Sequence, residues 1–400
     1  MTKSATVPKY RANIYSTDAI LDPHPHYAEL RELGPAVWLP RVRAYAISRY
    51  ADCKAVLLDD ETFVSKDGVA LNPVANRLGR GTTISSDGDE HALKRSVLAH
   101  RLTPKAVRKM TDAVEEKAQG IVDAALAKGV VDGVDHLATA LPTSIVPDLV
   151  GWPEEGRADL LRWAGATFDS LGPINRHSVK AAKASAEMLA FSRRVVRERS
   201  VLPGSMGADV LAAAAKNTIP ASQCPALMID YLAPSLDTTI GAISGALHLF
   251  ARHPEQWTML REDHDRIPNA INEVVRYESP IRAFTWRAVR DVDIDGAHVP
   301  AGSRVLVIYA SANRDPREWE DPDSFDITRD ATRQLGFGQG AHGCAGQGLA
   351  RLEAKTILRI LAEKVERIEE AGTPVRAVNN VIHRFERLPL KLIAAERKTS

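Results

Sequence analysis

Cysteine is scarce in this chain of 400 residues, which contains only Cys53, Cys224 and Cys344. An odd number of widely separated cysteines excludes a disulfide framework and is typical of a reducing cytoplasm. The chain also lacks an uninterrupted apolar run of about 18 residues, so we expect no membrane-spanning helix. Its first ten residues contain no apolar core of signal-peptide length. These absences predict a cytoplasmic protein that has no membrane partner.

An excess of charge of either sign is missing as well. The sequence has 52 Lys and Arg against 51 Asp and Glu, a formal net charge of +1. The balance therefore gives no indication of nucleic-acid binding. Hydrophobic residues make up 44% and charged residues 26%, as in ordinary globular proteins. We find no internal repeat and no low-complexity segment.

Glycine is concentrated in residues 335–346, which read LGFGQGAHGCAG. Four glycines precede Cys344 and Gly346 follows it, so the backbone turns tightly and approaches something closely. Apolar residues recur at helical spacing from Gln347 onward. The loop thus brings one thiol to a helix N-terminus, where N–H groups and the dipole lower a thiol pKa and favour a metal-binding thiolate. The alternative is a cysteine that is simply buried.

The pattern F-x-x-G-x-H-x-C-x-G at 337–346 resembles the haem-binding loop of the haem-thiolate monooxygenases, the cytochrome P-450 family. The resemblance implies that Cys344 ligates the iron, that Phe337 covers the thiolate and that His342 meets a haem propionate. It also places two loop glycines at the cofactor: Gly338 and Gly346. Because no C-x-x-C-H motif occurs, we expect haem b to be held non-covalently.

Basic residues outside the loop are further candidates for haem binding. His91 and Arg95 are spaced to face one side of a helix, and the resemblance implies that both contact a propionate. The alternative is a solvated helix face. Arg287 is expected to provide another propionate contact, although it stands one residue after the usual family position, which Trp286 occupies. Arg282 competes for this role.

A long apolar stretch at 225–250 carries Pro234, Ser235, Asp237 and Thr238 in its middle. Proline removes a helical hydrogen bond, and neighbouring hydroxyls can bond back to freed carbonyls. The stretch resembles the distal helix of the family, in which an acid–alcohol pair relays protons to bound oxygen. Asp237 and Thr238 occupy those positions. Pro234-Ser235 replaces the usual Ala-Gly, and a purely structural kink is the alternative.

Two further marks concern the fold. Glu273-x-x-Arg276 resembles the family element that braces the haem loop, and residues 312–329 resemble the coil that precedes this loop. The marks follow one order along nearly the whole chain, which implies one domain over 1–400. We expect a mainly α fold with small β-sheets, the helical triangular prism of the family. Helices are predicted near 104–128, 134–150, 154–170, 177–199 and 222–252, and a hairpin at 36–39 and 44–48.

The resemblance implies a monooxygenase that uses dioxygen and haem b, in which the thiolate favours O–O cleavage. We expect electrons from NAD(P)H to arrive through ferredoxin reductase and an iron–sulfur ferredoxin, and we expect a monomer. A peroxygenase driven by hydrogen peroxide and a non-catalytic haem-binding sensor are the alternatives. Steering by charge predicts that the ferredoxin docks on basic residues behind Cys344. These are Lys94, Arg101, Lys105, Arg108 and Arg351.

The substrate is expected to be small and aromatic, and to be hydroxylated or O-demethylated. Residues 168–175 and the C-terminal run resemble bacterial family members that oxidise small aromatic acids such as methoxybenzoates. The predicted pocket is mostly apolar, which suits a compact ring. Its lining residues are predicted to be the 65–86 loop with Phe168, Leu171, Leu232, Ser235, Ile281, Phe284, Val381 and Ile382.

The means of holding the substrate is left open by the sequence. Arg77 and Arg80 in the 65–86 loop are candidates to bind a carboxylate. In the resembled enzymes serines of the distal helix assist, but here Asp230 and Ala233 stand at those positions. Since Asp230 would repel a carboxylate, an acid and a phenol or other neutral polar substrate are both expected.

Overall fold

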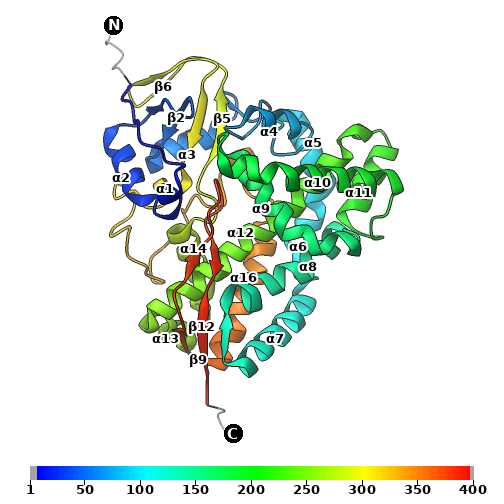
Figure 1. Ribbon diagram of the computed structural model, residues 1–400, viewed down its shortest axis with the longest axis vertical. Coiled ribbons are helices and arrows are strands. Elements are labelled where there is room, and N and C mark those ends of the chain that lie inside the picture. Colours follow the sequence, from blue (N-terminus) through cyan, green and yellow to red (C-terminus); the bar gives the residue numbers. More distant parts are fainter. Residues whose placement is uncertain (1–6, 397–400) are drawn as a thin grey trace.

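The computed structural model describes residues 7–396, and most of them are helical. Helices α4, α5, α10 and α11 lie on one side of a roughly triangular outline, α12 runs through its middle, and the largest sheet lies at one corner with α1–α3 (Figure 1). The α-helices are α1 (Thr17–Leu21), α2 (His24–Leu33), α3 (Tyr50–Leu58), α4 (Pro73–Leu78), α5 (Gly88–Ala99), α6 (Pro104–Arg108), α7 (Thr111–Lys128), α8 (Ala140–Val150), α9 (Leu160–Leu171), α10 (Arg176–Glu198), α11 (Met206–Ala215), α12 (Cys224–Arg252), α13 (Pro254–Glu262), α14 (Ile267–Glu278), α15 (Tyr309–Ala312) and α16 (Gln347–Lys364).

The strands form small sheets, as the sequence predicts. The largest has the order β1-β2-β8-β5-β3, with β2 and β8 parallel, and a second has the order β4-β12-β9. The hairpin predicted at 36–39 and 44–48 is confirmed, since Val37 pairs with Ala46. The strands are β1 (Val37–Leu39), β2 (Ala44–Ile47), β3 (Phe63–Val64), β4 (Val130–Asp132), β5 (Phe284–Ala288), β6 (Val292–Ile294), β7 (Ala297–Val299), β8 (Arg304–Val307), β9 (Val365–Glu370), β10 (Val375–Arg376), β11 (Phe385–Arg387) and β12 (Pro389–Ala394).

Helix α12 is the central element of the fold. It packs against α8, α9, α10, α14 and α16, which explains why its sequence is apolar almost all round. The helix continues through Pro234, whose ring removes one backbone donor. The predicted back-bonding is confirmed: the Ser235 hydroxyl donates to the Tyr231 carbonyl and the Thr238 hydroxyl to the Pro234 carbonyl, each at 2.6 Å.

A buried ion pair joins α14 to the coil that precedes the glycine loop. Glu273 and Arg276 have fully buried side chains, and the Arg276 Nε lies 2.7 Å from Glu273 Oε2. The Arg276 guanidinium also donates to the carbonyls of Asn313 and Ser324. Charges removed from water need such complete pairing. The pair therefore has the bracing role that the sequence predicts.

One predicted irregular segment contains a helix. Residues 65–86 include α4, which begins at Pro73, and the side chain of the preceding Asn72 accepts a hydrogen bond from the Val74 N–H. Asparagine as N-cap and proline at the first helical position form a local helix-start signal. None of the helices within residues 7–396 is both long and apolar enough to cross a lipid bilayer.

Candidate active site

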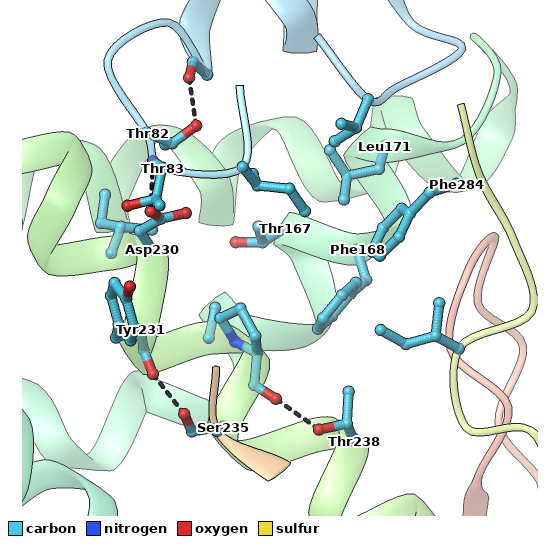
Figure 2. Close-up of a pocket in the computed structure, with 18 of the residues that line it drawn as sticks. Thr82, Thr83, Thr167, Phe168, Leu171, Asp230, Tyr231, Ser235, Thr238 and Phe284 are labelled. Carbon is cyan, nitrogen blue, oxygen red and sulfur yellow. Dashed lines mark hydrogen bonds between the residues drawn. The ribbon is translucent and has the colours of Figure 1, made fainter. Parts of the chain in front are cut away.

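A cavity of about 640 Å³ separates α12 from the N-terminal end of α16. Its floor is the glycine loop with Cys344, and its opposite wall comes from α12. The 65–86 segment, α9, α10 and β5 close the remaining sides. Figure 2 shows residues of the 65–86 segment, α9, α12 and β5 around the cavity. Six segments of the chain therefore meet at one site.

Cys344 lies in the floor, two residues before the N-cap residue of α16, Gly346. Burial raises the pKa of its thiol, while the N–H groups of Gly346 and Gln347 and the charge of Arg95 oppose this rise. The predicted lowering effect of the helix N-terminus on the thiol pKa is present, but burial outweighs it in the protein alone. The other two cysteines, Cys53 and Cys224, are free and buried.

The loop requires its glycines for two different reasons. Gly338 and Gly340 have φ angles of +67° and +68°, which residues with side chains rarely adopt. A Cβ on Gly340 would also lie 2.4 Å from the carbonyl oxygen of Leu57. The Cys344 N–H donates to the Phe337 carbonyl at 2.8 Å, and the Phe337 ring lines the cavity. The backbone therefore holds the thiol in one position.

One edge of the cavity floor is basic. His91, Arg95 and His342, all predicted for cofactor binding, line it together. The rings of His91 and His342 lie 4.3 Å apart between centroids. Arg95 donates to the carbonyl oxygens of residues 341 and 343 at 3.0 and 2.8 Å, so it also braces the loop. Burial, followed by the charges of His342 and Arg95, lowers the pKa of His91 to about 4.

His342 is held by the end of the segment that precedes α5. Its Nε2 lies 3.1 Å from the Ser65 hydroxyl and 3.4 Å from Asp87 Oδ1. Asp87 also accepts hydrogen bonds from the N–H groups of Ser65 and Lys66. Although burial acts to raise the pKa of Asp87, hydrogen bonds from His342 and Ser65 leave it lowered. An anionic Asp87 therefore orients His342 at the rim.

Neither arginine proposed for the third propionate contact reaches the cavity. Arg287 lies on the opposite face of β5, half exposed, with its Nε 3.6 Å from Asp67. Strand alternation turns Phe284 and Trp286 inward, and both line the cavity. Arg282 is buried and donates to the carbonyls of residues 20 and 382. The Arg287 prediction is thus wrong, and Trp286 occupies the wall position.

The predicted acid–alcohol pair is divided between two environments. Thr238 lines the cavity, with its hydroxyl bonded to the Pro234 carbonyl. Asp237 is fully buried on a face of α12 that does not line the cavity, and its Oδ1 lies 3.1 Å from Arg384 Nε. Burial raises the pKa of Asp237, and the Arg384 charge opposes the rise. Arg384 is partly exposed, so the buried carboxyl is one side chain away from solvent.

The cavity floor fits haem b. Its middle presents one thiol, that of Cys344, and a Cβ on the neighbouring Gly346 would lie in van der Waals contact with the thiol sulfur, at 4.0 Å. Small side chains of α12, among them Ala242 and Thr239, face the floor across the cavity. The basic edge matches the two carboxylates of the porphyrin. A flat macrocycle with its own four nitrogen ligands would need only a thiolate from the protein.

Comparison with known proteins agrees with this geometry. Residues 171–366 match the family model described as Cytochrome P450. The chain is 37% identical to cytochrome p450 CYP199A2 of Rhodopseudomonas palustris, over 98% of this chain and 96% of that one. This chain belongs to the cytochrome P450 family. It is therefore a monooxygenase whose cofactor is haem b, reduced by NAD(P)H through redox partners.

Two solved P450 structures share the fold. Mycobacterium marinum CYP268A2 in complex with pseudoionone is 27% identical, with a TM-score of 0.88 over 97% of this chain and 100% of that one. Cytochrome P450 CREJ in complex with (4-ethylphenyl) dihydrogen phosphate is 26% identical, with a TM-score of 0.85 over 93% and 98% of the two chains.

The substrate half of this P450 is largely apolar. Phe168, Leu171, Ser235, Ile281 and Phe284 line the cavity as predicted. Phe168, Leu171 and Phe284 lie together on one side of the view in Figure 2. Thr167, beside Phe168, also lines the cavity and donates its hydroxyl to the Trp163 carbonyl at 2.9 Å.

Three predicted pocket residues lie outside the lining. Leu232 is on another face of α12 and packs in the core between α9, α10 and α11. Val381 and Ile382 are buried beside Phe168, and Ile382 pairs with Ile281 in a β-bridge. They support the wall without facing the cavity. The sequence pattern indicated that these residues lie near the cavity, but not that their side chains are buried behind its wall.

The prediction that Arg77 or Arg80 binds a substrate carboxylate is not supported by their positions. Arg77 and Arg80 are exposed and do not line the cavity. Helix α4 turns Val74 and Leu78, which are one turn apart, toward the cavity, so Arg77 points elsewhere. Sequence reasoning missed lining residues on helices that helical spacing could have indicated, among them Arg193, Tyr231 and Glu353.

The proposed docking patch needs one correction. Lys94 is 2% exposed and its Nζ lies 2.7 Å from Glu90, so it cannot meet a partner. Arg101 forms a hydrogen-bonded ion pair with Asp209. Lys105 and Arg108 are exposed on α6, which packs beside α16.

Proposed function

We propose that this P450 inserts one oxygen atom of dioxygen into a small aromatic substrate, by hydroxylation or O-demethylation. The observation that carries this proposal is the wall formed by Phe168, Leu171 and Phe284, because aromatic and branched side chains suit a compact ring. P450 CREJ, a structural relative, binds a compound with a single aromatic ring, which supports the same substrate class.

The haem residues have separate tasks in this proposal. When bound, haem b supplies oxygen activation, which the electron donation of a Cys344 thiolate favours. His91, Arg95 and His342 hold the propionates at the basic edge. The glycine loop fixes the thiol, and the apolar wall orients the ring and excludes water.

Asp237 and Thr238 carry protons between solvent and the cavity. Because the Thr238 hydroxyl donates to the Pro234 carbonyl, its oxygen is left as an acceptor toward the cavity. Asp237 takes up protons on the side of Arg384, whose partial exposure links the buried carboxyl to solvent. Movement of the Asp237 side chain from Arg384 toward Thr238 then delivers the proton.

Electrons reach the site from an iron–sulfur ferredoxin, itself reduced by a ferredoxin reductase. Lys105 and Arg108 are exposed on α6 at the floor side of the molecule. A Cβ on Gly348, in the first turn of α16, would lie 3.6 Å from the side chain of Val107 on α6. An acidic carrier docked at α6 would therefore be close to Cys344.

Product formation from small ring compounds tests the proposal. Reactions with dioxygen, NADH, ferredoxin and reductase should yield one hydroxylated or demethylated product, with ¹⁸O from ¹⁸O₂. Equal turnover with hydrogen peroxide alone would instead identify a peroxygenase. Absence of turnover in both, with a normal haem spectrum, would identify a haem sensor. Oxidation of long-chain or polycyclic compounds only would overturn the aromatic assignment.

A further inference from the structure

The two ends of the substrate cavity differ in chemistry. Phe168, Leu171 and Phe284 form an apolar end, while Asp230 and Thr83 lie at the opposite end (Figure 2). Thr82 and Tyr231 line the same end as Asp230, which we call the acceptor end. A ring that fits between the two ends would contact apolar side chains on one side and the oxygen atoms of the acceptor end on the other.

Asp230 is held in place by the loop that crosses it. Its Oδ2 accepts a hydrogen bond of 2.6 Å from the Thr83 N–H. Burial raises the pKa of its carboxyl, and contacts with Thr83, the charge of Lys94 and the Ile84 N–H oppose this rise. A carboxylate has about four acceptor positions, so the bond from the Thr83 N–H leaves acceptor capacity toward the cavity.

Two of the positive charges near the cavity are already engaged by other groups. The charge of Lys94 lowers the pKa of Asp230, but the Lys94 Nζ lies 2.7 Å from Glu90. Arg95 donates to the loop carbonyls of residues 341 and 343. Arg193 lines the cavity from α10 but is exposed, and Arg77 does not line it. An anionic ligand at the acceptor end would therefore face Asp230, with the solvent-exposed Arg193 to offset its charge.

We propose that Asp230 recognises the substrate by accepting a hydrogen bond from a phenolic hydroxyl. This inference rests on the proposed function, because it names the polar group of the small aromatic substrate. The phenol ring lies against Phe168 and Phe284, and its hydroxyl points to Asp230. A benzoate is disfavoured, since its carboxylate would face the Asp230 carboxyl in a poorly solvated site.

Three ring compounds of similar size test this inference in the haem-loaded P450: 4-ethylphenol, its methyl ether and 4-ethylbenzoate. Affinity is read from the shift of the haem Soret band. A hydrogen bond to a charged group contributes about 1.5–3 kcal/mol, so the phenol should bind about 10- to 150-fold more tightly than its ether. Benzoate should bind more weakly than either.

Asp230→Asn is the discriminating variant, because the amide oxygen can still accept the Thr83 N–H. We expect the phenol-to-ether ratio to fall to a few-fold and benzoate binding to improve. Asp112→Asn is the matched control, since it makes the same carboxyl-to-amide change on the exposed first turn of α7 and should leave the ratio unchanged. The thiolate-type carbon monoxide spectrum verifies that each variant is folded.

The outcomes separate this inference from the proposed function. Equal binding of phenol and ether, tighter binding of benzoate, or an unchanged ratio in Asp230→Asn would overturn the role of Asp230. If those compounds were still oxidised, the proposed function would stand. If the ring compounds caused no spectral shift while larger aliphatic compounds did, the proposed function itself would fail. The wild-type series decides the question even if Asp230→Asn does not fold.

Discussion

The haem half and the substrate half of the cavity are built in different ways. In the haem half, one run of chain supplies the thiol, and backbone geometry fixes it through Gly338, Gly340 and the Cys344 N–H bond. In the substrate half, the 65–86 segment, α9, α10, α12 and β5 each contribute side chains to the wall. A site whose geometry is fixed by the backbone tolerates few substitutions. In a site assembled from side chains, single substitutions can change which ligand is bound. The comparison predicts all-or-none effects in the first half and graded effects in the second.

Removal of the thiol should have the largest effect. Cys344→Ala is expected to abolish the red-shifted Soret band of the reduced carbon monoxide complex, because no other residue would supply a thiolate. Cys53→Ala and Cys224→Ala are matched controls, since both cysteines are free and buried. Persistence of the band in Cys344→Ala would refute the assignment of the iron ligand.

The buried brace of the haem half should come next. Glu273→Ala leaves Arg276 buried without its partner, which costs about 3–5 kcal/mol of stability. Urea unfolding of the purified proteins measures the difference. Glu115→Gln, which breaks the more exposed pair with Arg359, should cost less than about 1 kcal/mol. Similar losses in both variants would show that burial does not distinguish the pairs.

Glu353 adds a pH-dependent difference within the haem half. Burial raises the pKa of its carboxyl to about 8, and neither oxygen has a hydrogen-bond partner in the described chain. Between pH 4.5 and 8 the unfolded chain ionises and the folded chain does not, so stability falls as pH rises. Glu353→Gln removes this pH-dependent contribution to the free energy of unfolding. Its stability relative to wild type should rise by about 3 kcal/mol from pH 5 to pH 7.5 in urea unfolding, at about 1.4 kcal/mol per unit. An unchanged difference would mean that Glu353 is ionised in the folded protein.

The sequence predicted the haem half of the cavity better than the substrate half. The glycine loop, Cys344 and His342 were predictable because their spacing lies within one short segment. Phe168 and Phe284 were found, but the depth of Leu232 and Ile382 was not, because depth depends on how separate elements pack. The Arg287 error had a local remedy: strand alternation with Phe284 indicates that Trp286, not Arg287, faces inward. The partner of Asp237 could not be predicted, since Arg384 reaches it from the end of the chain.

The proton pathway crosses between the halves and should give a graded effect. Thr238→Ala and Asp237→Asn are expected to lower product formed per NADH about 10-fold or more, with peroxide released, because positioned acid–base groups accelerate proton transfer. Haem content and substrate binding should stay near wild type. Ser244→Ala is the control, since its hydroxyl bonds to the Ile240 carbonyl of the same helix. Unchanged coupling in both variants would remove the pair from the mechanism.

The smallest effect is expected at the surface behind the haem half. Lys105 and Arg108 are exposed on α6, and each alone is an ordinary solvated charge. Together they should steer an acidic ferredoxin, and such steering weakens as salt shortens the Debye length to about 8 Å at 0.15 M. Lys105→Gln/Arg108→Gln should therefore slow reduction by ferredoxin a few-fold at low salt and flatten its salt dependence. Lys183→Gln/Lys216→Gln changes charge by the same amount on exposed parts of α10 and the end of α11, and should leave the rate unchanged. Equal slowing in both double variants would indicate a net-charge effect and would place the electron donor elsewhere.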